Sequence, residues 1–216
     1  MTARRDVDAR QLGFGDLLQA AEADNAARLF DRRTAHLPGD RDSAISFFGR
    51  LIEAHHAAML AADVAEAMRL REEAHHLAVK LNGGEGGICA HDDAPAYVLA
   101  RATAAPPGAV PRWGQTGTFT ITAADVRVRI ELEGIFGIGS SVGFWPGFAA
   151  HAVEVDRPFL SPPGSRSFLG IHAEPVPGLT PPDFAGRCIA AHFASELRGR
   201  LVRIEERYRD RCSDAA

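Results

Sequence analysis

Two copies of the tetrapeptide Glu-Ala-His-His are the part of this sequence whose residue types could do chemistry. They lie at 53–56 and 73–76, in a stretch free of proline. On a helix, a glutamate and a histidine three residues later face the same side, as in the helical bundles that hold carboxylate-bridged pairs of metal ions. The repeat therefore raises the hypothesis of a metal-dependent enzyme that uses Glu53, Glu73 and the neighbouring histidines.

The two copies differ in helical phase. At about 100° per residue, His55 and His56 flank the apolar stripe of their helix, whereas His75 lies at the edge of the next stripe and His76 on the opposite, wet side. Asp63 begins a helix-capping pattern, which predicts an antiparallel hairpin. The two copies would then be offset by roughly 12 Å along the axis. We therefore predict that they do not share one metal ion within a subunit, while sharing between subunits stays open.

A second group of ligand-type side chains follows a glycine-rich connector. Cys89, His91 and Asp92 supply the thiolate, imidazole and carboxylate that bind zinc and other divalent metals. Asp92 and Asp93 also suit the start of the next helix, which explains part of the group without a metal. The metal hypothesis therefore uses a divalent cation as cofactor, and its candidate ligands are His55, His56, His75, Cys89, His91 and Asp92.

Large aromatic residues and glycines alternate between positions 135 and 148. Aromatic side chains carry much of the energy of binding sites, so this segment is a candidate contact surface for a partner protein or a small ligand. The same composition also suits a plug packed into the core. The candidate binding residues are Phe136, Phe144, Trp145 and Phe148.

The same segment contains Gly139-Ser140-Ser141-Val142-Gly143, which matches the G-x-S-x-G pattern of the nucleophile elbow in α/β-hydrolases. That elbow requires a helix directly after the serine. Here Phe144-Trp145-Pro146-Gly147 follows instead, which favours a glycine-rich loop.

The elements that position these residues follow from hydrophobic spacing. Helices are expected near 15–36, from Ser43 to the hairpin turn, from Asp63 to Asn82, and over 94–104. Residues 118–122 and 126–133 alternate as a β-hairpin, further strands are expected near 149–155 and 167–173, and a long helix is expected from Thr180 to about Ile204.

This order predicts an α+β fold, in which a helical region with a hairpin precedes a four-stranded antiparallel sheet covered by the C-terminal helix. The expected regions are 1–104, a proline-rich linker at 105–112, and 113–216, packed as one unit.

Composition limits the function. The chain has 216 residues, a net charge of −4 and three cysteines, with no long apolar run and no secretory signal. These features predict a cytoplasmic protein with free thiols and no membrane span. The abundance of alanine and arginine indicates a GC-rich bacterial genome.

Acidic residues interleave with the arginines, which argues against nucleic-acid binding. A homodimer remains open. Because no catalytic constellation is complete, the leading hypothesis is a non-catalytic bacterial binding protein, and the alternative is the metal-dependent enzyme.

Overall fold

The computed structural model describes residues 6–141 and 143–213, with side chains over 15–140 and 143–209. It confirms the α+β fold, because helices precede a four-stranded antiparallel sheet and a further helix follows that sheet. The helices are α1 (Asp6–Thr34), α2 (Arg41–Ala61), α3 (Val64–Leu81), α4 (Pro95–Ala102), α5 (Pro181–Ser195) and α6 (Glu206–Ser213). The strands are β1 (Thr116–Ala123), β2 (Val126–Glu133), β3 (Phe148–Ala152) and β4 (Ser165–Phe168), with a 3-10 turn η1 at Ile138–Ser141.

Helices α2 and α3 form the predicted hairpin. Ala62 adopts the left-handed conformation with φ 57°, which ends α2. The carboxylate of Asp63 then accepts the backbone N–H of Glu66 at 3.1 Å and caps α3. Helix α2 begins at Arg41, before the predicted start at Ser43, because it is capped by Asp40, which accepts the N–H of Ser43 at 2.9 Å. Asp40 lies three residues before that N–H, as the capping geometry requires.

The sheet is a meander in the order β1-β2-β3-β4, with Phe119 of β1 opposite Ile130 of β2. Ala124 and Asp125 both have positive φ, which gives the tight turn whose twist suits a two-residue hairpin. In β2, Val126, Val128, Ile130 and Leu132 are buried, and the residues between them are exposed or half-buried. The alternation in the sequence therefore identified the inner face of the sheet correctly.

The C-terminal helix is shorter than its apolar spacing suggests. Helix α5 ends at Ser195, and both Arg198 (φ 49°) and Gly199 (φ 73°) are left-handed, so the helix cannot continue. The following segment instead pairs Val202 with Phe159 in an isolated antiparallel bridge. Ile204 is still buried, although it lies outside α5.

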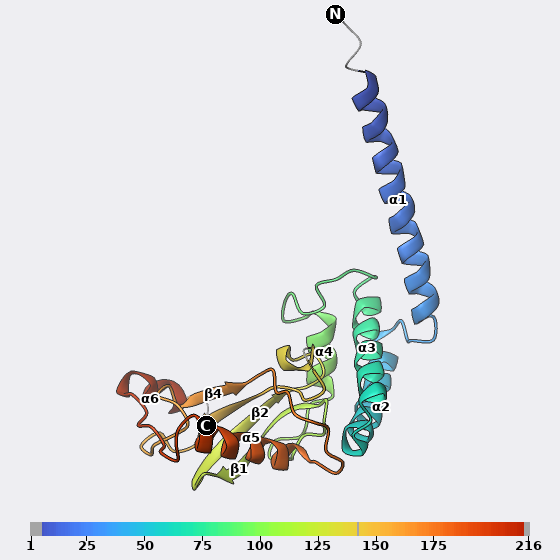
Figure 1. Ribbon diagram of the computed structural model, residues 1–216. Coiled ribbons are helices and arrows are strands. Elements are labelled where there is room, and N and C mark those ends of the chain that lie inside the picture. Colours follow the sequence, from blue (N-terminus) through green and yellow to red (C-terminus); the bar gives the residue numbers. More distant parts are fainter. Residues whose placement is uncertain (1–5, 142, 214–216) are drawn as a thin grey trace, which may run out of the picture.

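One hydrophobic cluster joins the helical half to the sheet half. It contains Phe48 of α2, Leu77 of α3, Ile130 of β2 and Phe184 of α5. Figure 1 shows the sheet and α5 on one side, the bundle of α2, α3 and α4 beside them, and α1 projecting away from both. Among the described residues, none of the helices combines the length and apolarity required to cross a membrane.

Candidate functional site

Arg71 on α3 is a buried cation whose hydrogen bonds, within the described part of the chain, go to a histidine and to backbone carbonyl oxygens and not to a carboxylate. Its side chain is 5% exposed. Nε donates to Nε2 of His55 at 3.0 Å, while the terminal nitrogens donate to the carbonyl oxygens of Ser140 at 3.0 Å, Gly143 at 2.7 Å and Phe144 at 2.6 Å. Burial lowers the Arg71 pKa to about 10. Arg71 therefore fastens the segment after β2 to the helix hairpin.

His55 on α2 completes this buried pair. Its side chain is 1% exposed, and Nδ1 lies 3.1 Å from the carbonyl oxygen of Trp113. Because Nε2 accepts a hydrogen bond from Arg71, the ring proton belongs on Nδ1, which donates to Trp113. Burial and the adjacent Arg71 charge lower the pKa of His55 to about 4. The histidine is therefore neutral near pH 7 and both of its ring nitrogens are engaged.

The segment held by Arg71 is also fixed by local hydrogen bonds between side chains and backbone. The hydroxyl of Ser140 donates to the carbonyl oxygen of Gly134 at 2.7 Å, and the N–H of Ile138 donates to the Glu133 carboxylate at 3.0 Å. A Cβ at Gly139 would lie 2.2 Å from the backbone nitrogen of Gly147, so only glycine permits this approach. The first glycine of the G-x-S-x-G pattern thus has a packing role. The side chain of Ser141 lies outside the described residues.

A groove of about 820 Å³ runs between α3 and this segment. Its walls are largely apolar and include Met68, Val79, Phe136 and Ile138, while Arg69, Glu72 and His75 are also part of its lining. Ile138 is 72% exposed. A second groove of about 330 Å³ shares Phe136 and Ile138 and extends towards Tyr97. The two grooves therefore meet at Phe136 and Ile138.

The structure separates the four aromatic residues predicted to bind. Trp145 and Phe148 are each 2% exposed and pack against Phe184 of α5. Phe144 is half-buried and packs edge-on against Trp145. Phe136 is half-buried too, but it stacks on Phe48 at 5.3 Å and lines both grooves. Of the four, Phe136 has the position of a contact residue, while Trp145 and Phe148 belong to the core.

The candidate metal ligands lie apart. His56 accepts the backbone N–H of Trp113 at 3.1 Å, and burial lowers its pKa. His75 is exposed beside Phe136, with ring centroids 6.1 Å apart. Cys89, His91 and Asp92 are exposed in the connector between α3 and α4. Over the described part of the chain, no three His, Cys, Asp or Glu side chains gather at one point.

Because the candidate metal ligands lie apart, we predict that removing metal ions leaves the stability of the protein unchanged. Dialysis of the purified chain against a chelator is expected to shift its thermal unfolding midpoint by less than about 1 °C, because a bound metal contributes free energy only to the state that ligates it. Elemental analysis of the untreated protein provides the control. A stoichiometric metal whose removal lowers the midpoint would contradict the prediction and restore the ligands predicted above.

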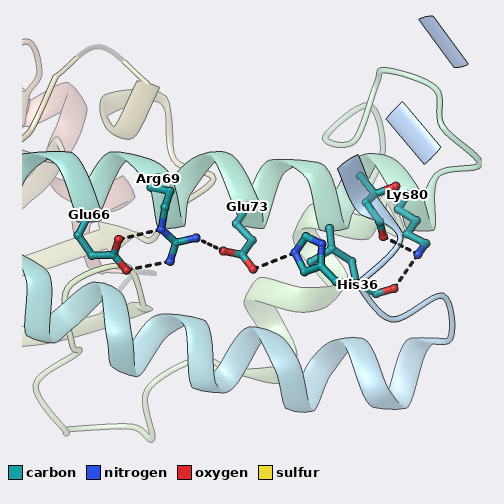
Figure 2. Close-up of polar contacts among 7 residues, drawn as sticks. His36, Glu66, Arg69, Glu73 and Lys80 are labelled. Atoms are coloured by element: carbon teal, nitrogen blue, oxygen red, sulfur yellow. Dashed lines mark hydrogen bonds and ion pairs between the residues drawn. The ribbon is translucent and has the colours of Figure 1, made fainter. Parts of the chain in front are cut away.

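The exposure of His75 and His76 differs from the prediction, because helical phase within α3 does not show which side of that helix α1 covers. His76 was expected on the wet face, but it is half-buried and its ring packs against Phe30 of α1 at 6.0 Å, while His75 is the more exposed of the two. A chain of polar contacts runs along α3 from Glu66 through Arg69 to Glu73, which contacts His36 in the turn after α1 (Figure 2). Arg69 pairs with both carboxylates, so its positive charge offsets part of their negative charge.

The described cysteines are free thiols. Cys89 is exposed, and Cys188 is half-buried in α5. Burial raises the pKa of both thiols, to about 11 for Cys188, so neither is activated as a nucleophile. The side chain of Cys212 lies outside the described residues.

Arg71 was not predicted, although the sequence contains a signal for it. Ala67, Leu70, Ala74, Leu77 and Ala78 form the apolar stripe of α3, and Arg71 falls at a stripe position by the same helical spacing. A charged residue on a core-facing stripe needs buried partners. Its carbonyl acceptors lie 69–73 residues away in sequence, so the pattern identifies the need without identifying these partners.

Comparison with known proteins finds few relatives of this chain. No family model matches the chain, and no solved structure matches it. Two proteins of Escherichia coli, each named Protein KlcB, are similar in sequence. One is 38% identical over 182 residues, which cover 84% of this chain and 43% of the relative. The other is 36% identical over 183 residues, which cover 82% of this chain and 37% of the relative. The chain therefore spans less than half the length of the curated relatives that it matches, and their shared name states no activity.

Proposed function

We propose that this chain is a non-catalytic binding protein that holds an apolar segment of a partner protein in the groove between α3 and residues 135–140. The supporting observation is that Ile138 is 72% exposed although its segment is tied to the hairpin through buried Arg71. An exposed apolar side chain on a rigid support loses little conformational entropy on binding. The groove also has the apolar interior and charged margin that protein contact sites share.

A catalytic role has less support. His55 is the most perturbed histidine, but both of its nitrogens are occupied by Arg71 and Trp113. It is therefore not available to exchange protons with a substrate. The exposed groove residue His75 makes a ring contact with Phe136 and, among the described residues, no hydrogen bond or ion pair with an acidic side chain. We place the binding function in the bacterial cytoplasm, where the free thiols of Cys89 and Cys188 would stay reduced.

The partner segment is expected to present two or three apolar side chains. Met68, Phe136 and Ile138 all line the groove, and Tyr97 lines the adjoining groove that shares Phe136 and Ile138. Met68 suits such a lining because its flexible thioether adapts to different side chains. Arg69 and Glu72 at the margin can orient polar positions of the segment without dominating its affinity.

A selection from a displayed library of random peptides tests this function. We expect peptides enriched in apolar anchors, and we expect Ile138→Asp to weaken their binding at least about tenfold, because it places a charge in an apolar contact. Ile138 is exposed, so the variant should remain folded. Val110→Asp is the matched control, since Val110 is 52% exposed and lines neither groove.

The proposal predicts that Ile138→Asp weakens peptide binding and that Val110→Asp does not. Selected peptides that bind Ile138→Asp as tightly as the unaltered protein would contradict it. So would peptides that lose binding equally to Val110→Asp, because the contact would then lie elsewhere on the surface.

A further inference from the structure

Strand β1 is the long edge of the sheet. It pairs with β2 along all eight of its residues, without a bulge, and lies at the margin of the sheet (Figure 1). The opposite edge strand, β4, has only four residues and includes Arg166. Natural proteins keep edge strands short or place lysine, proline, a bulge or an inward charge there, because an open edge pairs with other chains. Strand β1 has none of these protections.

The free backbone groups of β1 belong to threonines. Residues 123 and 126 flank the two-residue turn, which makes them a hydrogen-bonded pair. The residue before Ala123, and every second residue before that, therefore points its N–H and C=O groups away from β2. These residues are Thr116, Thr118, Thr120 and Thr122.

One of these four threonines already has a neighbour at the edge. The carbonyl oxygen of Thr116 accepts the N–H of Ala105 at 2.9 Å, which confirms the direction of these groups. The other three are exposed and, within the described part of the chain, make no hydrogen bond on that side. The free edge of the sheet therefore runs over residues 118–122.

We propose that the chain forms a homodimer in which β1 of a second copy pairs antiparallel with this free edge, with the two-fold axis at Thr120. Thr120 then faces Thr120 of the second copy, Thr118 faces its Thr122, and Thr122 faces its Thr118. Each of these three pairs exchanges two hydrogen bonds, which satisfies every free backbone group of the edge. The sheets of the two copies become one continuous sheet.

The two ends of this pairing match the two ends of the free edge. Thr116 would face residue 124 of the second copy, but Ala105 already occupies the edge there. Residue 124 begins the turn to β2, so the second copy leaves the edge at that point. Moving the axis by one residue would place Thr122 opposite the occupied Thr116, or Thr118 opposite the turn. The register centred on Thr120 is therefore the one that uses the whole free edge.

The side chains of β1 favour a second copy as the occupant of the edge. In this register the exposed face has three threonine–threonine pairs, and the inner face has Phe119 opposite Ile121 in both directions. Threonine pairs, and pairs of an aromatic with a β-branched residue, stabilise antiparallel strands. Ile121 is only half-buried within one chain, and the pairing covers it further. Strand β1 is therefore complementary to itself.

Helix α5 supplies complementary charges beside the same edge. A hollow of about 470 Å³ lies between α5 and β1, and its lining includes Ile121, Asp183 and Arg187. Arg187 is exposed and, over the described residues, forms no ion pair. The two-fold axis lies next to Ile121, so it brings the hollows of both copies together and sets their α5 helices antiparallel. Arg187 of each copy can then face Asp183 of the other, an attraction that suits a second copy.

Sedimentation velocity of the full chain at about 0.1 mM tests the association. We expect a dimer, because a Kd of roughly 1 μM leaves little monomer at that concentration. Thr120→Pro should weaken the dimer at least about tenfold, since proline removes the N–H at the axis. An edge strand accepts proline where the N–H faces away from the sheet. Thr120→Val is the matched control, because it keeps the N–H and the β-branched shape, and it should dimerise like the unaltered protein.

The outcomes separate this dimer from other interfaces. A monomeric unaltered protein would overturn the proposal and leave the edge to a strand of another protein. Equal dimerisation of Thr120→Pro and Thr120→Val would also overturn it, because the interface would then lie elsewhere. Ile138→Asp should dimerise normally, so the failure of this dimer and the failure of the proposed groove on α3 are distinguishable.

Disulfide trapping tests the register, and it decides the question if Thr120→Pro does not fold. The native cysteines are first replaced by alanine. Thr120→Cys should cross-link to itself on oxidation, because facing Cα atoms at the axis are about 5.5 Å apart, within the range of a disulfide. Thr118→Cys should not, because its two copies would be about 14 Å apart along the strands. Failure of Thr120→Cys to cross-link, or equal cross-linking of both variants, would contradict the proposal.

Discussion

Replacing Arg71 by methionine is expected to lower the free energy of unfolding by about 3 kcal/mol or more, the largest effect of any single change considered for this chain. Methionine fills much of the volume but donates no hydrogen bond. The buried carbonyl oxygen of Ser140 and the part-buried carbonyl oxygens of Gly143 and Phe144 would each lose the donor that Arg71 provides. Chemical denaturation followed by tryptophan fluorescence measures the loss.

Arg69→Met provides the matched control, two residues earlier on the same helix. The Arg69 side chain is 55% exposed and pairs with Glu66 and Glu73. Exposed pairs of this kind contribute about 1 kcal/mol or less. Equal losses in the two variants would show that Arg71 is no more than a surface charge. If Arg71→Met does not fold, Arg71→Lys retains a charge and fewer donors, and an intermediate loss is expected from it.

The second large effect is a loss of stability in mild acid. The pKa of His55 falls from an ordinary value of 6.5 to about 4 in the folded protein. The unfolded chain therefore binds more protons than the folded chain between those two values. The stabilisation from neutral His55 is complete above about pH 6.5 and is lost as the pH falls towards 4. The shift corresponds to about 3 kcal/mol.

A substitution that cannot titrate isolates this contribution. His55→Gln retains an oxygen that can accept from Arg71, so the variant should fold with reduced stability at pH 7. Its stability should then fall less steeply than that of the unaltered protein from pH 6.5 to 4, as measured by urea denaturation at several pH values. Parallel curves for the two proteins would mean that His55 is not the group responsible. His56 titrates in both proteins, so its contribution cancels.

Local patterns predicted the elements of this fold well. The alternation of apolar and polar residues over 126–133 predicted β2 and its buried face. The capping pattern that begins at Asp63 predicted the turn of the helix hairpin. Hydrophobic spacing failed at the end of α5, because Leu197, Leu201 and Ile204 keep a helical spacing although the backbone turns at Arg198 and Gly199. Apolar spacing reports burial, and a buried segment can be irregular.

The candidate site was less predictable because its contacts are distant in sequence. His55 and His75 belong to identical tetrapeptides, but one pairs with Arg71 in the core and the other lies exposed beside Phe136. Helical phase showed that the two copies differ, but which of their histidines is buried depends on tertiary packing. The aromatic segment was identified as a whole, but its division into core residues such as Trp145 and groove residues such as Phe136 depends on the position of α5.

Hydrogen–deuterium exchange of residues 135–145 tests most directly whether Arg71 holds the groove wall in place. In the unaltered protein we expect the amides of this segment to be strongly protected, because a fixed segment opens only through a costly fluctuation. In Arg71→Lys the same amides should exchange much faster, while those of β1 and β2 keep their protection. Rapid exchange of the segment in the unaltered protein, or identical exchange in both proteins, would contradict this account.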